Sequence, residues 1–307
     1  MLTVVLAFLA AVGYSGSDYT AGLAARGTSV VRVTFVVELT YCVLLVAAVP
    51  FASTQSPSLS ALAWGAGAGV SGVIAAMALY LGFRYEAFSV VSSVSAVGSA
   101  VFSVLAGLLL GERPGPASLA GIVLALPAIA AVSMSTDKAV KADESAETAG
   151  GDSAGGEPAP LRPGATGEHA AGVACGMIAG AGFGLFFLGL NQAGSGSDLW
   201  PLAASAVAGV AVVLCIAVSM RQVGLPAGGS RRLAIVSGVT SAAGTYAFFL
   251  ATHRGLLAVT AVITSLYPAG TIVLARLLLS ERLTRARVAG LGLAAISIAL
   301  IAAANAR

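Results

Sequence analysis

The sequence predicts an all-α membrane protein with ten transmembrane helices, arranged as two inverted five-helix repeats. Three observations predict this fold class: a mean hydropathy of +0.94 with 9% charged residues, ten long apolar runs, and a repeat that carries the first five runs onto the last five. Soluble domains carry roughly 25% charged residues. A chain with 9% cannot cover a water-facing surface, so we expect lipid to be the solvent for most of it.

The apolar runs are long enough to cross a bilayer as helices, because a hydrocarbon core of ~30 Å takes about 20 residues. The first five runs cover residues 2–24, 30–48, 61–83, 88–110 and 117–134. The last five cover residues 170–190, 199–220, 233–251, 257–279 and 288–304. The first run lacks the basic flank of a secretory signal peptide, so we interpret it as a span.

A polar segment divides the chain into two predicted domains. The first repeat covers residues 1–136, the linker 137–168 and the second repeat 170–305. The linker has seven acidic and three basic residues among many Gly, Pro, Ala and Ser residues. It has too few bulky apolar residues to form a core, so we expect it to be disordered.

The two repeats superpose at a single offset of 169 residues. A Leu-Leu-Leu-Gly-Glu-Arg segment, ending in Glu112 and Arg113, falls on a Leu-Leu-Leu-Ser-Glu-Arg segment, ending in Glu281 and Arg282. Because five is an odd number, the second repeat must enter the membrane upside down relative to the first. Many secondary transporters are built from inverted repeats with a central binding site between them.

The basic residues predict the orientation, because Lys and Arg beside short loops favour the cytoplasmic side. Twelve of them lie on the side reached after the first span, and three lie on the opposite side. This count places both termini outside and the linker in the cytoplasm. We expect a multi-pass protein of a bacterial inner membrane.

Outside the linker, the chain resembles EamA-type transporters of the drug/metabolite transporter superfamily. The resemblance rests on the duplication, on the two Glu-Arg endings, on Leu266-Tyr267-Pro268 and on Arg32. It implies export of amino acids, nucleosides, drugs or other metabolites through a cavity between the halves. The chain differs from the family pattern at residues 13–16, where Trp-Gly is common, and at Gly98-Ser99, where Pro is common. Family members usually have cytoplasmic termini, opposite to the charge count.

Two acidic residues lie inside predicted spans. A charge near the bilayer centre costs at least ~2.5 kcal/mol, so such residues tend to face a pathway or a partner. Glu38 lies about 10 Å inside the second span at 1.5 Å per residue, and Asp18 lies in the Gly- and Ser-rich part of the first. Neither has an acidic counterpart in the second half, where Val207 and Phe187 stand. We predict contact with solute or a coupling proton; a buried ion pair with arginine is the alternative.

Other residues complete the candidate pathway. Four tyrosines could offer hydroxyls or ring faces to a solute, or could pack at interfaces: Tyr14, Tyr80, Tyr246 and Tyr267. The gate and hinge candidates lie mostly at matching places in the two halves: Gly13, Gly16, Gly98, Gly182, Gly184 and Pro268. Close helix packing is the alternative for the glycines. We interpret four residues as structural, with the carboxylates favouring the following helix: Glu112, Arg113, Glu281 and Arg282.

These features predict a secondary transporter, expected to export small organic metabolites or drugs, with proton coupling left open. The alternatives are a lipid-handling or partner subunit that transports nothing and, less favoured, an intramembrane enzyme. Two histidines, three scattered cysteines and no P-loop leave little material for catalysis, so we expect no enzyme activity, metal or cofactor. The expected partners are a small-molecule solute and the bilayer but no nucleic acid, and a homodimer is left open.

Overall fold

The computed structural model describes residues 1–53, 56–85, 88–128, 165–194, 198–268, 270 and 285–304, and the regular structure within them is helical. Seven described helices are long and apolar enough to cross a membrane: α1 (Leu2–Arg26), α2 (Val30–Ala52), α3 (Leu59–Tyr85), α4 (Phe88–Leu109), α6 (Ala165–Gln192), α7 (Trp200–Ser219) and α8 (Gly228–Thr252). The remaining described helices are α9 (Leu257–Thr264), α11 (Arg285–Ala304) and a shorter apolar one, Pro116–Ala128. The prediction of an all-α membrane protein is confirmed.

The seven long helices follow the apolar runs of the sequence, and their ends lie within five residues of the predicted ones. One difference is at α6, which begins at Ala165, inside the predicted linker. The rest of that linker lies outside the described residues. So do residues 271–279 of the predicted ninth span, and Glu281 and Arg282 of the repeated signature.

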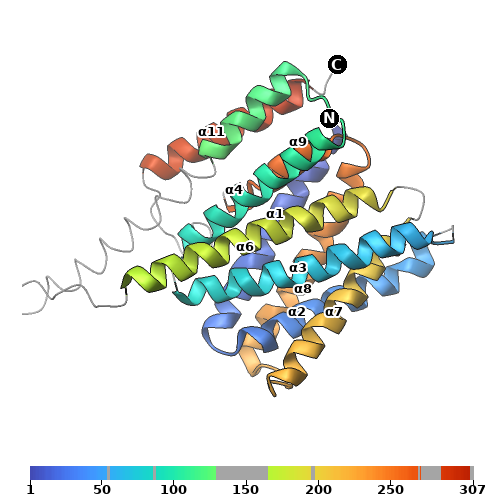
Figure 1. Ribbon diagram of the computed structural model, residues 1–307, viewed down its shortest axis with the longest axis vertical. Coiled ribbons are helices and arrows are strands. Elements are labelled where there is room, and N and C mark those ends of the chain that lie inside the picture. Colours follow the sequence, from blue (N-terminus) through green and yellow to red (C-terminus); the bar gives the residue numbers. More distant parts are fainter. Residues whose placement is uncertain are drawn as a thin grey trace, which may run out of the picture.

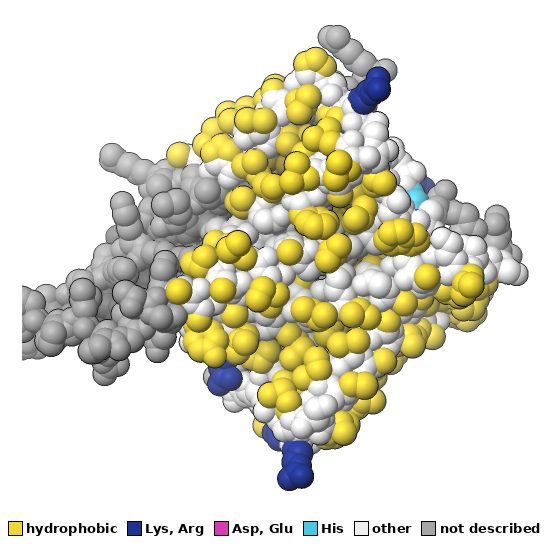
Figure 2. All heavy atoms as spheres, in the orientation of Figure 1, with side chains coloured by type: hydrophobic (Ala, Val, Ile, Leu, Met, Phe, Trp, Pro, Cys, Tyr) yellow, Lys and Arg dark blue, Asp and Glu magenta, His cyan; other side chains and the backbone are white. Residues whose placement is uncertain are grey.

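The outer surface of the bundle is apolar. Figure 2 shows hydrophobic side chains over most of the visible face, with Lys and Arg at its edges. Large apolar side chains such as Phe8, Val43 and Met177 are at least half exposed. A patch of this extent on a water-soluble monomer would be an aggregation site, whereas in a bilayer it faces acyl chains.

Helices of the first half pack mainly against helices of the second half. In Figure 1, α1 lies along α8 and α3 lies along α6, and both pairs are extensive contacts. α4 packs against α6 and α9, and α2 against α7 and α8. The start of α1 and the end of α11 lie at the same end of the bundle (Figure 1). The core of the molecule is therefore the interface between its halves.

The predicted ninth span is broken in the middle. α9 ends at Thr264, a turn follows, and helical conformation resumes at Tyr267. Pro268 accounts for the break, because it has no N–H to donate to the Thr264 carbonyl and its ring crowds that carbonyl. Ser15 of α1 stabilises the broken segment: its hydroxyl donates a hydrogen bond of 2.7 Å to the Tyr267 carbonyl.

Candidate functional site: a central cavity

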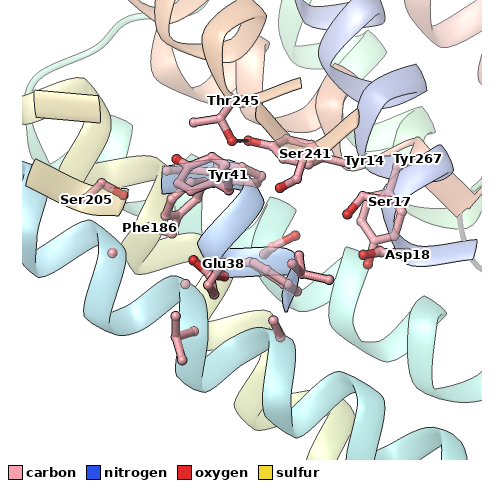
Figure 3. A pocket seen from close by; sticks show the side chains of 18 of the residues that line it. Tyr14, Ser17, Asp18, Glu38, Tyr41, Phe186, Ser205, Ser241, Thr245 and Tyr267 are labelled. Atoms are coloured by element: carbon pink, nitrogen blue, oxygen red, sulfur yellow. Dashed lines mark hydrogen bonds between the residues drawn. The ribbon is translucent and has the colours of Figure 1, made fainter. Parts of the chain in front are cut away.

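A cavity of ≈ 70 Å³ lies between the two halves of the bundle (Figure 3). Side chains of α1, α2, α3 and α4 line it from the first half, and side chains of α6, α7, α8 and Tyr267 line it from the second. One buried water needs about 10–15 Å³ of such volume, so the cavity has room for several waters or a small solute.

Both predicted carboxylates line this cavity. Asp18 of α1 is 8% exposed, and Glu38 of α2 is partly buried. Tyr80 of α3 lies close enough to both to interact electrostatically with each. Among the described residues that line the cavity there is no Lys, Arg or His. An arginine partner within the cavity, the alternative for these acids, is therefore absent from its described lining.

The Glu38 carboxylate lies against bare backbone of α7. A Cβ atom placed on Gly209 would be 2.8 Å from Glu38 Oε2, so no larger residue fits there without a shift. Tyr41 follows one turn after Glu38 on α2, and Ser205 precedes Gly209 by about one turn on α7. In Figure 3, Tyr41 lies between Glu38 and the side of the cavity that carries Thr245.

Two hydroxyls beside Glu38 are buried without a hydrogen-bond partner. Tyr41 lies near Ser205 and Thr245. Nevertheless, neither Tyr41 Oη nor Ser205 Oγ forms a hydrogen bond of normal geometry within the described part of the chain. Buried polar groups are nearly always paired, so unpaired ones at a cavity wall indicate a place for a ligand or water.

The opposite end of the cavity is built around Asp18. Figure 3 shows Asp18 near Ser17 and Tyr267, and Tyr267 also interacts electrostatically with it. Ser17 shares a hydrogen bond of 2.9 Å with Ser237 of α8. Tyr14 shares one of 3.0 Å with Thr245. These two hydrogen bonds hold α1 to α8, whereas the hydroxyls of Tyr41 and Ser205 have no partner in the described part of the chain.

One wall of the cavity is aromatic. Phe183, Phe186 and Phe187 of α6 line it. Phe187 stacks on Phe248 with ring centroids 4.4 Å apart and lies 6.1 Å from the ring of Tyr14. The cavity thus combines two carboxylates, several hydroxyls and an apolar ring surface.

Three of the four candidate tyrosines line the cavity, namely Tyr14, Tyr80 and Tyr267. Tyr246 does not. It is 41% exposed and lines a separate pocket of ≈ 300 Å³ with His253 and Arg254. The reason is helical geometry: Thr245 faces the cavity, and the next residue on a helix points about 100° away from it.

The glycine candidates lie at close helix crossings and do not line the cavity. A Cβ on Gly13 would be 2.7 Å from Gly244 Cα, and one on Gly182 would be 2.8 Å from Ala75 Cβ. The remaining candidates meet Thr240, Gly180 and Phe102; they are Gly16, Gly98 and Gly184, respectively. Close packing is therefore what these glycines provide in this conformation, and a hinge role for them stays a prediction.

Glu112 caps a helix, although not the one that follows it. Gly111, with φ of +87°, ends α4, and the Glu112 N–H donates to the Gly107 carbonyl at 2.9 Å. This turn aims the carboxylate at α9, where it accepts hydrogen bonds from the N–H groups of Leu257 (2.6 Å) and Ala258 (3.0 Å). The expected local role at the following helix is thus wrong: Glu112 joins the first half to the second.

Some site residues were not predicted. Tyr41 could have been found from its position one turn after Glu38, and the aromatic wall from the Phe-Gly-Leu-Phe-Phe run of α6. Ser205 carries no signal, because serines are common in all the spans. Arg113 is exposed, as a residue at a helix end is expected to be.

Comparison with known proteins agrees with this fold. Residues 170–303 match the sequence profile of the EamA-like transporter family. No curated protein matches the chain. Twenty-four chains of solved structures match it. One, described only as "Crystal structure of protein", is 16% identical with a TM-score of 0.68, over 97% of this chain and 95% of its own. That likeness shows the fold alone. The resemblance stated from the sequence is confirmed over residues 170–303, which match the EamA-like transporter family.

Proposed function

We propose that this protein is a secondary transporter that exports small organic solutes across a bacterial inner membrane in exchange for protons. The observation that carries the proposal is the cavity between the halves, with Asp18 and Glu38 in its wall and no basic residue among its described lining. An intramembrane carboxylate is costly without a partner, so its presence in the wall of a cavity supports a role in binding an ion or a solute.

We further propose that ten spans form two inverted repeats. Helix contacts support this, because an offset of 169 residues turns the α1–α8 contact into the α6–α3 contact. The same offset carries Gly13 onto Gly182 and Ala75 onto Gly244, the residues at the centres of those two crossings. Two related half-bundles of this kind can open alternately on opposite sides of a fixed site. A homodimer stays a prediction.

Glu38 is the proposed coupling residue. Its carboxylate borders the cavity, so a proton and a solute that both need this oxygen pair exclude each other. Proton entry from one side then releases the solute, and solute binding from the other side displaces the proton. Asp18 lies at the other end of the cavity, next to Tyr267, and serves as an additional carboxylate for the solute or for a second proton.

Reconstitution tests this function. The purified full chain in proteoliposomes should exchange at least one member of a panel of labelled amino acids, nucleosides and amines, and an imposed pH gradient should drive its accumulation. Glu38→Gln keeps the side-chain shape and removes titration, so it should abolish pH-driven accumulation while preserving monodisperse protein. Glu38→Asp should retain part of the activity with a shifted pH profile.

Two results would contradict the proposal. Wild-type accumulation by Glu38→Gln at every pH tested would show that this carboxylate does not couple transport to protons. Failure of the wild-type protein to exchange any member of the panel, in vesicles where its insertion is verified, would favour a subunit without transport of its own.

A further inference from the structure

The corner of the cavity where α2 meets α7 is a cluster of hydrogen-bond acceptors. It contains the Glu38 carboxylate, Tyr41 Oη and Ser205 Oγ. Tyr41 is 5% exposed and Ser205 is 1% exposed, and neither hydroxyl has a hydrogen-bond partner among the described residues. Gly209 keeps the backbone of α7 bare beside Glu38 Oε2. A carboxyl group and two hydroxyls without a described hydrogen-bond partner therefore line one part of the cavity.

The charged side chains that line this space determine the sign of the charge that its ligand carries. With two carboxylates and no basic side chain among the described lining, an anion would be repelled and a zwitterion would leave its own carboxylate without a counter-ion. Burying an ionised group costs several kcal/mol unless it is paired and hydrogen-bonded. A cation satisfies that condition here, because Glu38 supplies the opposite charge.

The hydrogen-bonding groups of this space restrict the class of solute further. A primary ammonium group has three N–H donors and no acceptor, which matches three acceptor groups: one carboxylate and two hydroxyl oxygens. A quaternary ammonium has no N–H and would leave Tyr41 and Ser205 unpaired. Phe183, Phe186 and Phe187 form an apolar wall of the same cavity and suit a short hydrocarbon body. The volume of ≈ 70 Å³ suits a small molecule.

We propose that the solute is a small primary amine whose ammonium group binds Glu38, Tyr41 and Ser205 while its hydrocarbon body lies against the aromatic side chains of α6. This inference names the substrate class of the transport function proposed above and rests on that function. It also assigns Tyr41 and Ser205 as specificity-determining residues, which distinguish a primary amine from its methylated analogue.

A matched series of four solutes tests the assignment. Isopentylamine, its trimethylammonium analogue, leucine and 4-methylpentanoate share one branched hydrocarbon body and differ in charged groups. Binding to the purified full chain is measured by calorimetry, and uptake is measured in proteoliposomes. Isopentylamine should bind most tightly, and Tyr41→Phe and Ser205→Ala should each weaken it by about tenfold, the size of one lost hydrogen bond to a charged group. Neither variant should change binding of the trimethylammonium analogue.

Tyr246→Phe and Ser219→Ala are the control variants, because both residues are exposed and lie outside the cavity. If Tyr41→Phe fails to fold, Ser205→Ala alone decides the question. Equal binding of leucine or the carboxylic acid, equal binding of the trimethylammonium analogue, or wild-type affinity in both cavity variants would overturn the assignment. Amine binding with the expected variant effects but without uptake would instead refute transport and leave the amine site standing. Uptake of leucine that the cavity variants leave unchanged would refute the amine site and leave the transport function standing.

Discussion

The Glu38 carboxylate, the proposed coupling group, lies close to Gly209 of α7. A methyl group on Gly209 would lie 2.8 Å from Glu38 Oε2 and 3.1 Å from Val73 Cγ2. We predict that Gly209→Ala displaces the flexible carboxylate and reduces solute affinity and pH-driven uptake at least severalfold. The fold should survive, because overpacking typically costs about 1–3 kcal/mol.

Gly67→Ala is the matched control for this substitution, because a Cβ at Gly67 meets no atom within 4 Å. It should leave uptake and thermal stability unchanged. Uptake by Gly209→Ala equal to that of the control, measured in the same vesicles, would show that the position of the Glu38 carboxylate does not matter for transport.

At the residue scale, the sequence predicts charged site residues better than neutral ones. Asp18 and Glu38 could be predicted because a charge in lipid is costly, and a charged residue there is therefore expected to face a pathway or a partner whatever the packing. Ser205 could not, because its importance depends on which face of α7 meets α2. Tyr246 lies outside the cavity, and composition does not show that Thr245, one residue earlier, takes the inward position.

The start of α9 depends on a side chain from the other half of the molecule. Its N-cap residue, Leu256, has no side-chain hydrogen bond to offer, and Glu112 supplies both capping bonds instead. We predict that Glu112→Ala destabilises the protein by about 1–2 kcal/mol, through loss of capping and of the favourable charge at a helix N-terminus. Glu112→Gln keeps one acceptor oxygen and should have a smaller effect.

Thermal unfolding in detergent measures this effect, with Arg113→Ala as the control because its side chain is exposed. The expected order of midpoints is wild type and Arg113→Ala together, then Glu112→Gln, then Glu112→Ala. Equal midpoints for all four proteins would mean that the capping bonds do not contribute to stability.

At the element scale, the apolar runs predicted the helices and their approximate ends but not their interruptions or partners. The break at Ser265-Leu266 follows from Pro268, yet Pro50 lies inside an unbroken α2. The difference is position: Pro50 lies in the last turn of its helix, whereas Pro268 follows α9 in the middle of the predicted span. The target of Glu112 was predicted incorrectly because a capping partner 145 residues away leaves no local pattern.

At the scale of the whole molecule, the charge distribution makes orientation testable. α1 begins and α11 ends at one end of the bundle, while Arg84 of α3 and the α7–α8 connection with Arg221 lie towards the other. We predict that a reporter fluorescent only in the cytoplasm stays dark when fused after Arg307. The same reporter inserted near residue 150 should fluoresce.

The opposite pair of signals would place the termini in the cytoplasm, the usual arrangement of the family. Expression of both fusions is verified on the same blot, so that a dark fusion is not mistaken for a missing protein. Two bright or two dark fusions would place residue 150 and the C-terminus on the same side of the membrane. That result would contradict the five spans predicted between them and so would revise the ten-span topology itself.

The sequence predicts the fold class of the whole molecule, but it does not predict which helices pack against each other. The 169-residue offset indicated two related halves, because it holds from the first span to the last. It did not show that each half packs chiefly against the other, as α1 does on α8 and α3 on α6. Small residues at the crossings suit many partners, so the choice of partner depends on the full three-dimensional arrangement.

This cross-packing has a consequence for how a cell makes the protein. α1 and α3 emerge from the ribosome long before α8 and α6, and at about 5–20 residues per second the interval is on the order of ten seconds. Throughout it, surfaces such as the one around Gly13 border lipid instead of protein. Insertion machinery and membrane proteases therefore meet the first half as an unshielded intermediate in every round of synthesis.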